Sequence, residues 1–83
     1  MRILYFAWIR AKIGIAAEDV TPPAEVTTVG ALLDWLADRG PSYAEALKTR
    51  SVVKTAVNQE YVDDHYPVAA GDEIALFPPV TGG

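Results

Sequence analysis

The stretch TVGALLDWLADRGP, residues 28–41, decides the fold because it predicts one amphipathic helix with a clear start and a clear end. Thr28 is a good N-cap, and Gly40 followed by Pro41 stops a helix. Pro41 can then serve as the first residue of a second short helix. The apolar stripe of the main helix consists of Val29, Leu32, Leu33 and Leu36. The apolar positions of the second helix are Tyr43, Ala44 and Leu47.

The residues before this helix predict two strands. Residues 3–9, ILYFAWI, are rich in aromatic and β-branched types and are too short for a typical helix. A weaker strand is expected over residues 18–22, and residues 10–17 are expected to hold a helical turn or a hairpin connection. Alternation in the first strand should point Ile3, Tyr5, Ala7 and Ile9 into the core, and Leu4, Phe6 and Trp8 away from it.

The residues after the helices predict three more extended segments. Residues 52–57 form the first of them, and residues 60–62 form a short piece after an Asn58-Gln59 turn. The last strand, residues 73–77, alternates cleanly. Ile74 and Leu76 should face the core, opposite to Glu73, Ala75 and Phe77.

This order of elements predicts an α+β fold in which a mixed sheet of four to five strands wraps around one main helix. That is the β-grasp, ubiquitin-like arrangement, with the first and last strands as neighbours and a right-handed crossover from the second strand to the third. Eighty-three residues leave room for one domain. We expect it to span residues 1–77, followed by an extended tail over residues 78–83.

Composition excludes several classes of function. Seven basic against eleven acidic residues give a net charge of −4, the wrong sign for a phosphate backbone or an anionic membrane surface. We therefore expect no nucleic acid and no membrane as partners, and a basic protein partner instead. The chain has no run of 18 apolar residues, and its first residues suit a buried strand better than a signal peptide. This predicts a cytoplasmic protein.

The side chains offer little for catalysis. There are no cysteines and one histidine, which rules out thiol catalysis and Cys-based or multi-histidine metal sites. Ser42 and Ser51 lie in no nucleophile motif. His65, beside Asp63 and Asp64, is best read as a surface turn residue, with a metal or general-base role as the alternative. We expect no metal site and no enzyme activity from this chain on its own.

The C-terminal segment FPPVTGG, residues 77–83, carries the strongest functional signal. Pro78 and Pro79 stiffen the exit from the last strand and cannot continue the sheet. Glycines at positions 82 and 83 carry no side chain, so the tip can enter a channel too narrow for any Cβ. At about 3.3 Å per residue the tail would project ~20 Å, enough to place the carboxylate of Gly83 in another protein's active site.

With these residues in view, the chain resembles the small, sulfur-carrying subunits of molybdopterin synthase (the MoaD type) along nearly its whole length. Related thiamine-pathway carriers share the two glycines but generally lack the Phe-Pro-Pro stem. The residues that carry the resemblance are Phe6-Ala7, Arg10, Ala56-Val57-Asn58-Gln59, Gly71-Asp72-Glu73 and the segment 77–83.

The resemblance implies a mechanism and partners. Gly83 would be adenylated with ATP by a separate activating enzyme and converted to a thiocarboxylate, with a separate sulfur donor and no cofactor bound to the carrier. The tail, including Val80, Thr81 and Gly82, would enter the large subunit of a heterotetrameric molybdopterin synthase. Sulfur would then pass to cyclic pyranopterin monophosphate, on catalytic groups of the large subunit.

A docking patch is expected beside the tail. Phe77 faces away from the core, and Phe6 should lie close to it if the first and last strands are neighbours. Tyr61 and Arg10 are expected at its rim, positions that members of the resembled family use toward both partners. The alternative for Phe6 and Trp8 is that the chain's own loops cover them.

Two other functions stay open. The chain could carry sulfur for another route, such as cysteine, thiamine or tRNA thiolation. It could also be a ubiquitin-like modifier or a non-covalent binding module that uses the same fold without sulfur.

Overall fold

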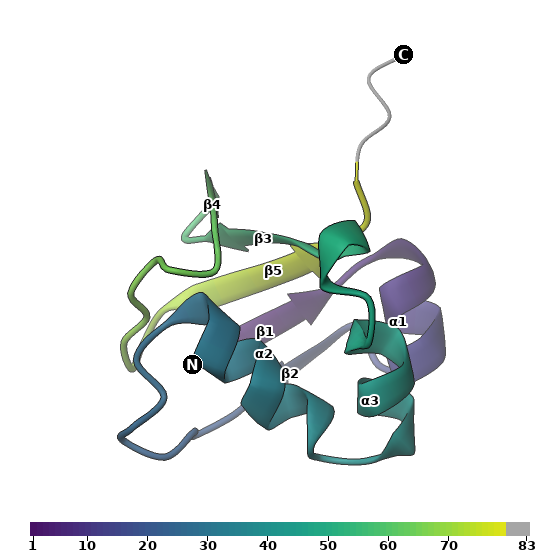
Figure 1. The fold of residues 1–83 in the computed structure, drawn as a ribbon, viewed down its shortest axis with the longest axis horizontal. Coiled ribbons are helices and arrows are strands. Elements are labelled where there is room, and N and C mark those ends of the chain that lie inside the picture. The colour runs from purple at the N-terminus through teal and green to yellow at the C-terminus, as the bar shows by residue number, and fades with distance from the viewer. Residues whose placement is uncertain (80–83) are drawn as a thin grey trace.

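A computed structural model describes residues 1–79 of the chain, and its elements are shown in Figure 1. Within these residues, three α-helices and one short 3₁₀-helix are combined with five strands. The elements in chain order are β1 (Arg2–Tyr5), α1 (Ala7–Ile13), β2 (Ala17–Asp19), α2 (Val29–Ala37), α3 (Pro41–Leu47), η1 (Arg50–Val52), β3 (Lys54–Val57), β4 (Glu60–Val62) and β5 (Glu73–Phe77).

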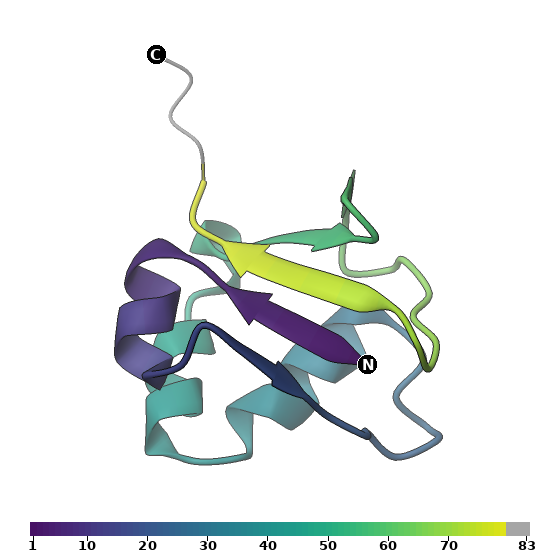
Figure 2. The same ribbon diagram turned by 180° about the vertical axis from the view of Figure 1, so that it is seen from behind.

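The strands form one mixed sheet in the order β2-β1-β5-β3-β4. The first and last strands are parallel neighbours, with Ile3 opposite Ile74 and Tyr5 opposite Leu76, while the other pairs are antiparallel. Helices α2 and α3 lie against one face of the sheet and α1 lies at the end of β1, and Figure 2 shows the other face of the sheet in front of α2 and α3. This confirms the predicted α+β, β-grasp architecture.

The predicted main helix is confirmed from its N-cap through its apolar stripe. The Thr28 hydroxyl accepts a hydrogen bond from the Ala31 backbone N–H at 3.2 Å, and all four stripe residues are completely buried. The helix ends at Ala37, before Gly40, and Pro41 begins α3 as expected. In α3 the buried residues are Ala46 and Leu47, whereas Ala44 is exposed, so the predicted position of Ala44 was wrong.

The first strand is shorter than predicted. It ends at Tyr5, and the expected second half of the strand, including Trp8 and Ile9, belongs to helix α1. Ala7 has a φ of 53°, a left-handed turn that reverses the chain direction between strand and helix. Ile9 still reaches the core, now from a helix, while Ala7 is exposed. Composition favoured a strand here, but local β-propensity is weak against tertiary packing.

Smaller differences affect the other strands. The second strand covers Ala17–Asp19 rather than residues 18–22, and the third begins at Lys54 because η1 takes up Arg50–Val52. The 60–62 and 73–77 strands are as predicted. Within β5, Ile74 and Leu76 are completely buried, and the three residues between and beside them are partly exposed.

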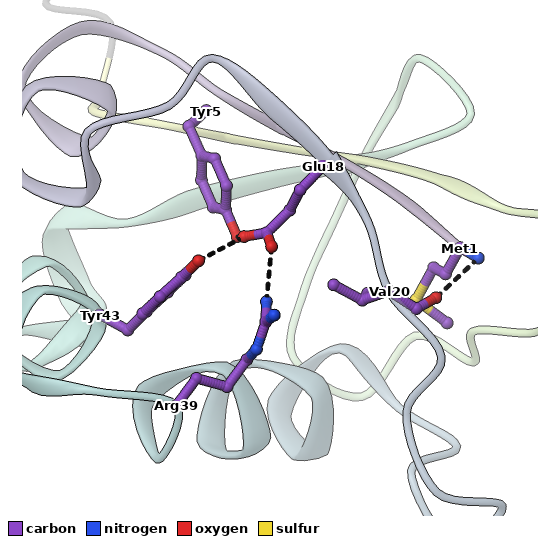
Figure 3. A network of polar contacts seen from close by, with 6 residues as sticks. All are labelled: Met1, Tyr5, Glu18, Val20, Arg39 and Tyr43. Atoms are coloured by element: carbon purple, nitrogen blue, oxygen red, sulfur yellow. Dashed lines mark hydrogen bonds and ion pairs between the residues drawn. The ribbon is translucent and has the colours of Figure 1, made fainter.

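A polar network centred on Glu18 ties the edge strand β2 to the helices (Figure 3). One carboxylate oxygen of Glu18 accepts hydrogen bonds from the hydroxyls of Tyr5 at 2.8 Å and Tyr43 at 2.7 Å. The other oxygen accepts from the Arg39 guanidinium at 2.8 Å. That guanidinium also lies 5.1 Å from the centre of the Tyr43 ring, a cation–π contact. One side chain thus joins β1, β2, α3 and the α2–α3 connection.

The network shifts the titration of its members. Burial raises the pKa of the Tyr5 hydroxyl well above its ordinary value, and the adjacent Glu18 carboxylate adds to the shift. Burial also works against ionisation of Glu18, but hydrogen bonds from Tyr43, Tyr5 and Arg39 outweigh it and lower the pKa of this carboxyl group. Glu18 is therefore held as a carboxylate that stabilises the fold.

We expect Glu18→Gln to lower the free energy of unfolding at pH 7 by ~1–3 kcal/mol, because a hydrogen-bonded charge is lost and the new NH₂ group faces donors. Since the folded-state pKa of Glu18 lies below the unfolded value, its stabilisation is complete above about pH 4.3 and is lost as the pH falls through the folded pKa. Urea unfolding should show that the difference in free energy of unfolding between wild type and variant is smaller at pH 3 than at pH 7.

The matched control is Asp19→Asn, in the same strand as Glu18. It removes an exposed carboxylate that lies 3.2 Å from the Arg2 guanidinium. This change should cost ~0–1 kcal/mol. A gap between wild type and Glu18→Gln that stays constant from pH 7 to pH 3 would contradict the role given to the Glu18 carboxylate.

Candidate functional site

The stem of the predicted tail leaves the sheet at the end of β5. Phe77 is the last residue of that strand, and Pro78 and Pro79 follow it without joining the sheet. Val80, Thr81, Gly82 and Gly83 lie outside the described residues, so the roles assigned to them stay predictions.

An open hollow of about 400 Å³ lies beside the stem. The Tyr61 and Phe77 rings pack against each other there, with centroids 5.4 Å apart and a tilt of 42°. We call this hollow the aromatic hollow. Its lining residues are Phe6, Tyr61, Phe77, Pro78 and Pro79.

Sheet register explains why Tyr61 and Phe77 meet. Ala56 of β3 is paired with Tyr61 of β4 on one side and with Ala75 of β5 on the other. Phe77 lies two residues beyond Ala75 and therefore points to the same face of the sheet. Strand β3 lies between them, and the small side chain of Ala56 leaves room for the rings to approach each other. The predicted neighbourhood of Phe77 and Tyr61 is thus confirmed.

Phe6 also lies beside Phe77, but not for the predicted reason. It is the N-cap of α1 rather than a member of the first strand, and its backbone N–H donates to the Leu76 carbonyl at 3.1 Å. This bond adds one step to the pairing of β1 with β5 and fixes Phe6 at the sheet end. Phe6 is 46% exposed and Trp8 is 37% exposed, so the alternative in which loops cover them is wrong.

Arg10 lies on the exposed side of α1, one helical turn after Phe6, with its backbone N–H donating to the Phe6 carbonyl at 3.2 Å. It is not among the residues that line the aromatic hollow. Its predicted contact with partners therefore stays a prediction.

Lys54 and Val62 belong to the same surface and were not singled out from the sequence. They line a second hollow of about 290 Å³ together with Thr55, Tyr61, Phe77 and Pro79. Lys54 is paired with Phe77 across β3 and β5, so it adds a positive charge beside the stem. Strand pairing is the signal that would have found it, but the sequence alone did not fix the register.

The side chains considered for a metal or general-base role lie in an exposed turn. His65 is exposed in a turn, where its backbone N–H donates to an Asp63 carboxylate oxygen at 2.9 Å. Within residues 1–79 no three His, Asp or Glu side chains are grouped so as to hold a metal ion. What the described residues offer is an exposed aromatic hollow next to the Pro78-Pro79 stem.

The helices of the described part of the chain can be compared with what a membrane-spanning helix requires. None of its helices combines the length and the apolar character that crossing a bilayer requires.

Comparisons with known proteins agree with this geometry. A family model described as the ThiS family matches residues 3–83. The molybdopterin synthase sulfur carrier subunit of Escherichia coli (strain K12) is 40% identical over 83 residues, which cover 100% of this chain and 99% of that protein.

Solved structures share the fold. Small archaeal modifier protein 1 of Haloferax volcanii has a TM-score of 0.76 and 30% identity, covering 96% of this chain and 97% of its own. In a complex of subunits 1 and 2 of molybdopterin-converting factor from Helicobacter pylori 26695, one chain is similar with a TM-score of 0.64 and 24% identity, covering 99% and 96% of the two chains.

The family match spans all but two residues of the chain, and the E. coli relative is similar from end to end. The chain therefore belongs to the ThiS family, together with the sulfur carrier subunits of molybdopterin synthase.

Proposed function

We propose that this protein carries sulfur as a thiocarboxylate on Gly83 and donates it in molybdopterin synthesis. The observation that carries the proposal is the Pro78-Pro79 stem, which leaves β5 directly beside an exposed aromatic hollow. A stem at this place can deliver a tail tip to a partner that is docked on the hollow. Full-length similarity to molybdopterin synthase sulfur carrier subunits supports the pathway.

The chemistry needs activation from outside the chain, because a carboxylate is a poor electrophile. An activating enzyme would join the Gly83 carboxylate to the AMP part of ATP and release pyrophosphate. Sulfide from a sulfur donor would then displace AMP, so that a carbon–sulfur bond replaces the carbon–oxygen bond to AMP. The sulfur would finally be transferred to cyclic pyranopterin monophosphate, and water would cleave the carbon–sulfur bond and regenerate the Gly83 carboxylate. ATP and the donor act at the activating step and are not bound cofactors of this chain.

The catalytic side chains would belong to the partners. The large subunit of molybdopterin synthase is the proposed partner for transfer, in a heterotetramer, and the complex of two subunits in the H. pylori structure supports such a pairing. The chain would be an enzyme component only within that assembly, in the cytoplasm. Phe6, Tyr61 and Phe77 would anchor the docked partner, with Arg10 at the rim.

A second candidate is a protein modifier, favoured by the similarity to small archaeal modifier protein 1. In that case the Gly83 acyl-adenylate would react with a lysine amine and form an amide bond. Sulfur transfer to a different acceptor, as in cysteine, thiamine or tRNA thiolation, uses the same activated tail. The acceptor distinguishes these functions, while the tail chemistry begins in the same way.

We expect incubation with the activating enzyme, ATP and a sulfur source to convert the protein to a species in which one oxygen is replaced by sulfur. Intact-mass spectrometry measures this change, and fragmentation should assign it to Gly83. Omitting ATP, or deleting Gly83, provides the control without conversion. An unchanged mass with an activating enzyme of proven activity would remove the carrier hypothesis.

Gly82→Val should leave the fold intact and abolish most sulfur transfer. A β-branched side chain restricts the backbone and widens a tail that must pass through a narrow opening. Transfer is measured as the rate of molybdopterin formation with the preformed thiocarboxylate, and circular dichroism checks folding. Thr81→Val exchanges one β-branched side chain for another of similar size one residue earlier and is the control. Transfer at the wild-type rate by Gly82→Val would refute the narrow-channel argument.

Phe77→Ala and Leu76→Ala should separate docking from folding. Phe77→Ala is expected to weaken binding to the large subunit by ~1–3 kcal/mol, the range of a buried aromatic anchor. Leu76 is completely buried, so its truncation should instead lower the free energy of unfolding by ~2–5 kcal/mol. Titration calorimetry and urea unfolding measure the two effects. If Phe77→Ala binds normally and is the more destabilising change, Phe77 is a core residue and not an anchor.

A further inference from the structure

Two of the motifs that carry the family resemblance, Ala56–Gln59 and Gly71–Glu73, have no part in the tail chemistry, yet they meet in the structure. The side-chain NH₂ of Asn58 donates to an Asp72 carboxylate oxygen at 3.1 Å. The side-chain carbonyl of Asn58 accepts from the Glu73 backbone N–H at 3.0 Å. The Asn58 backbone N–H donates to the Glu73 carbonyl at 2.8 Å. We call these three bonds the Asn58 clasp.

The clasp lies where the β3–β5 ladder would otherwise end. Val57 is paired with Ile74, so Asn58 comes next to Glu73 in register. Asn58 and Gln59 have φ angles of 51° and 71°, the left-handed conformation that a two-residue hairpin turn between Val57 and Glu60 requires. Asn58 has left the extended conformation, and its side-chain oxygen takes the place of a main-chain acceptor for the Glu73 N–H.

Asp72 extends the same chain of bonds. Its second carboxylate oxygen accepts from the Ala69 backbone N–H at 2.8 Å. The β3–β4 turn is thereby fixed to the turn that precedes β5. Gly71, with a φ of 91°, allows that turn to form.

We infer that Asn58 is a positioning residue for the aromatic hollow. It holds the turn that leads into β4, and β4 presents Tyr61 to Phe77. Strand β4 has three residues and lies at the edge of the sheet, paired with β3. Tyr61 is 77% exposed, so little packing holds its ring in place other than the Phe77 ring. The inference rests on the proposed docking role of this hollow.

The residue type follows from the left-handed turn and from the two side-chain bonds of the clasp. Glycine would adopt the left-handed turn more easily but would leave the Glu73 N–H and the Asp72 carboxylate to water. Aspartate could accept from Glu73 but could not donate to Asp72, and it would place two negative charges together. Asparagine combines tolerance of the left-handed region with one donor and one acceptor at the required places.

The test compares Asn58→Gly with Gln59→Gly. Both introduce glycine at a left-handed position of the same turn, but Gln59 takes no part in the clasp. We expect Asn58→Gly to weaken binding to the large subunit roughly threefold to tenfold and Gln59→Gly to leave it unchanged. Calorimetry is done at a temperature where urea unfolding shows both variants fully folded. Amide exchange at residues 60–62 should accelerate in Asn58→Gly.

A double-mutant cycle with Tyr61→Ala separates positioning from general stability. If Asn58 acts through Tyr61, Asn58→Gly should cause no further loss of affinity in the Tyr61→Ala background. An equal loss in both backgrounds overturns the inference. Wild-type affinity of Asn58→Gly overturns it as well.

A swap of the two side chains provides the rescue. Asn58→Asp alone should weaken binding, because its carboxylate faces Asp72. The pair Asn58→Asp with Asp72→Asn reverses the donor and acceptor and should restore affinity to within about twofold of wild type. Failure of this rescue in a folded double variant contradicts the clasp. If Tyr61→Ala and Phe77→Ala both bind normally, it is the proposed docking role that fails, and amide exchange in Asn58→Gly still reports on the clasp itself.

Discussion

The parallel pairing of β1 with β5 is the interaction on which the rest of this structure depends. It joins the two ends of the chain in the middle of the sheet, and the paired residues Ile3, Ile74, Tyr5 and Leu76 are all at most 1% exposed. Burial of these side chains offsets the entropy lost in closing so long a loop. Since β5 continues directly into the proline stem, the same pairing decides where the stem emerges. It also places Phe6, which follows β1, beside Phe77.

The sheet separates two kinds of stabilisation. On one face the α2 stripe and the inner residues of β1 and β5 form a continuous apolar core. At the β2 edge, the Glu18 carboxylate holds a strand, two tyrosines and Arg39 together through hydrogen bonds. The aromatic hollow lies on the outer face, to which Tyr61 and Phe77 both point. The core and the aromatic hollow thus use different side chains, although adjacent residues of β5, Leu76 and Phe77, belong to one and the other.

The sequence predicted those parts of the fold that depend on strict periodicity. The spacing of apolar residues in 29–36 predicts only a helix, and the alternation in residues 73–77 predicts only a strand. The structure confirms both. The prediction failed at residues 6–9, where aromatic and β-branched residues favour a strand, whereas the helical turn expected after residue 9 is present as the second half of α1. There the chain turns at Ala7 into helix α1, so that Ile9 packs in the core from a helix instead. β-propensity is a property of single residues, whereas the turn at Ala7 depends on the tertiary packing of the residues that follow it.

For the candidate site, the sequence by itself determined which residues are available: the Phe-Pro-Pro stem, Gly82 and Gly83, and the aromatic side chains. Only the tertiary structure decided which of them are neighbours. Phe6, Tyr61 and Phe77 come from three separate segments, and Lys54 and the Asn58 clasp join them through strand pairing. The physical reason is that register between strands is a long-range property. It is set by packing and hydrogen bonding across the whole sheet, and no local pattern contains it.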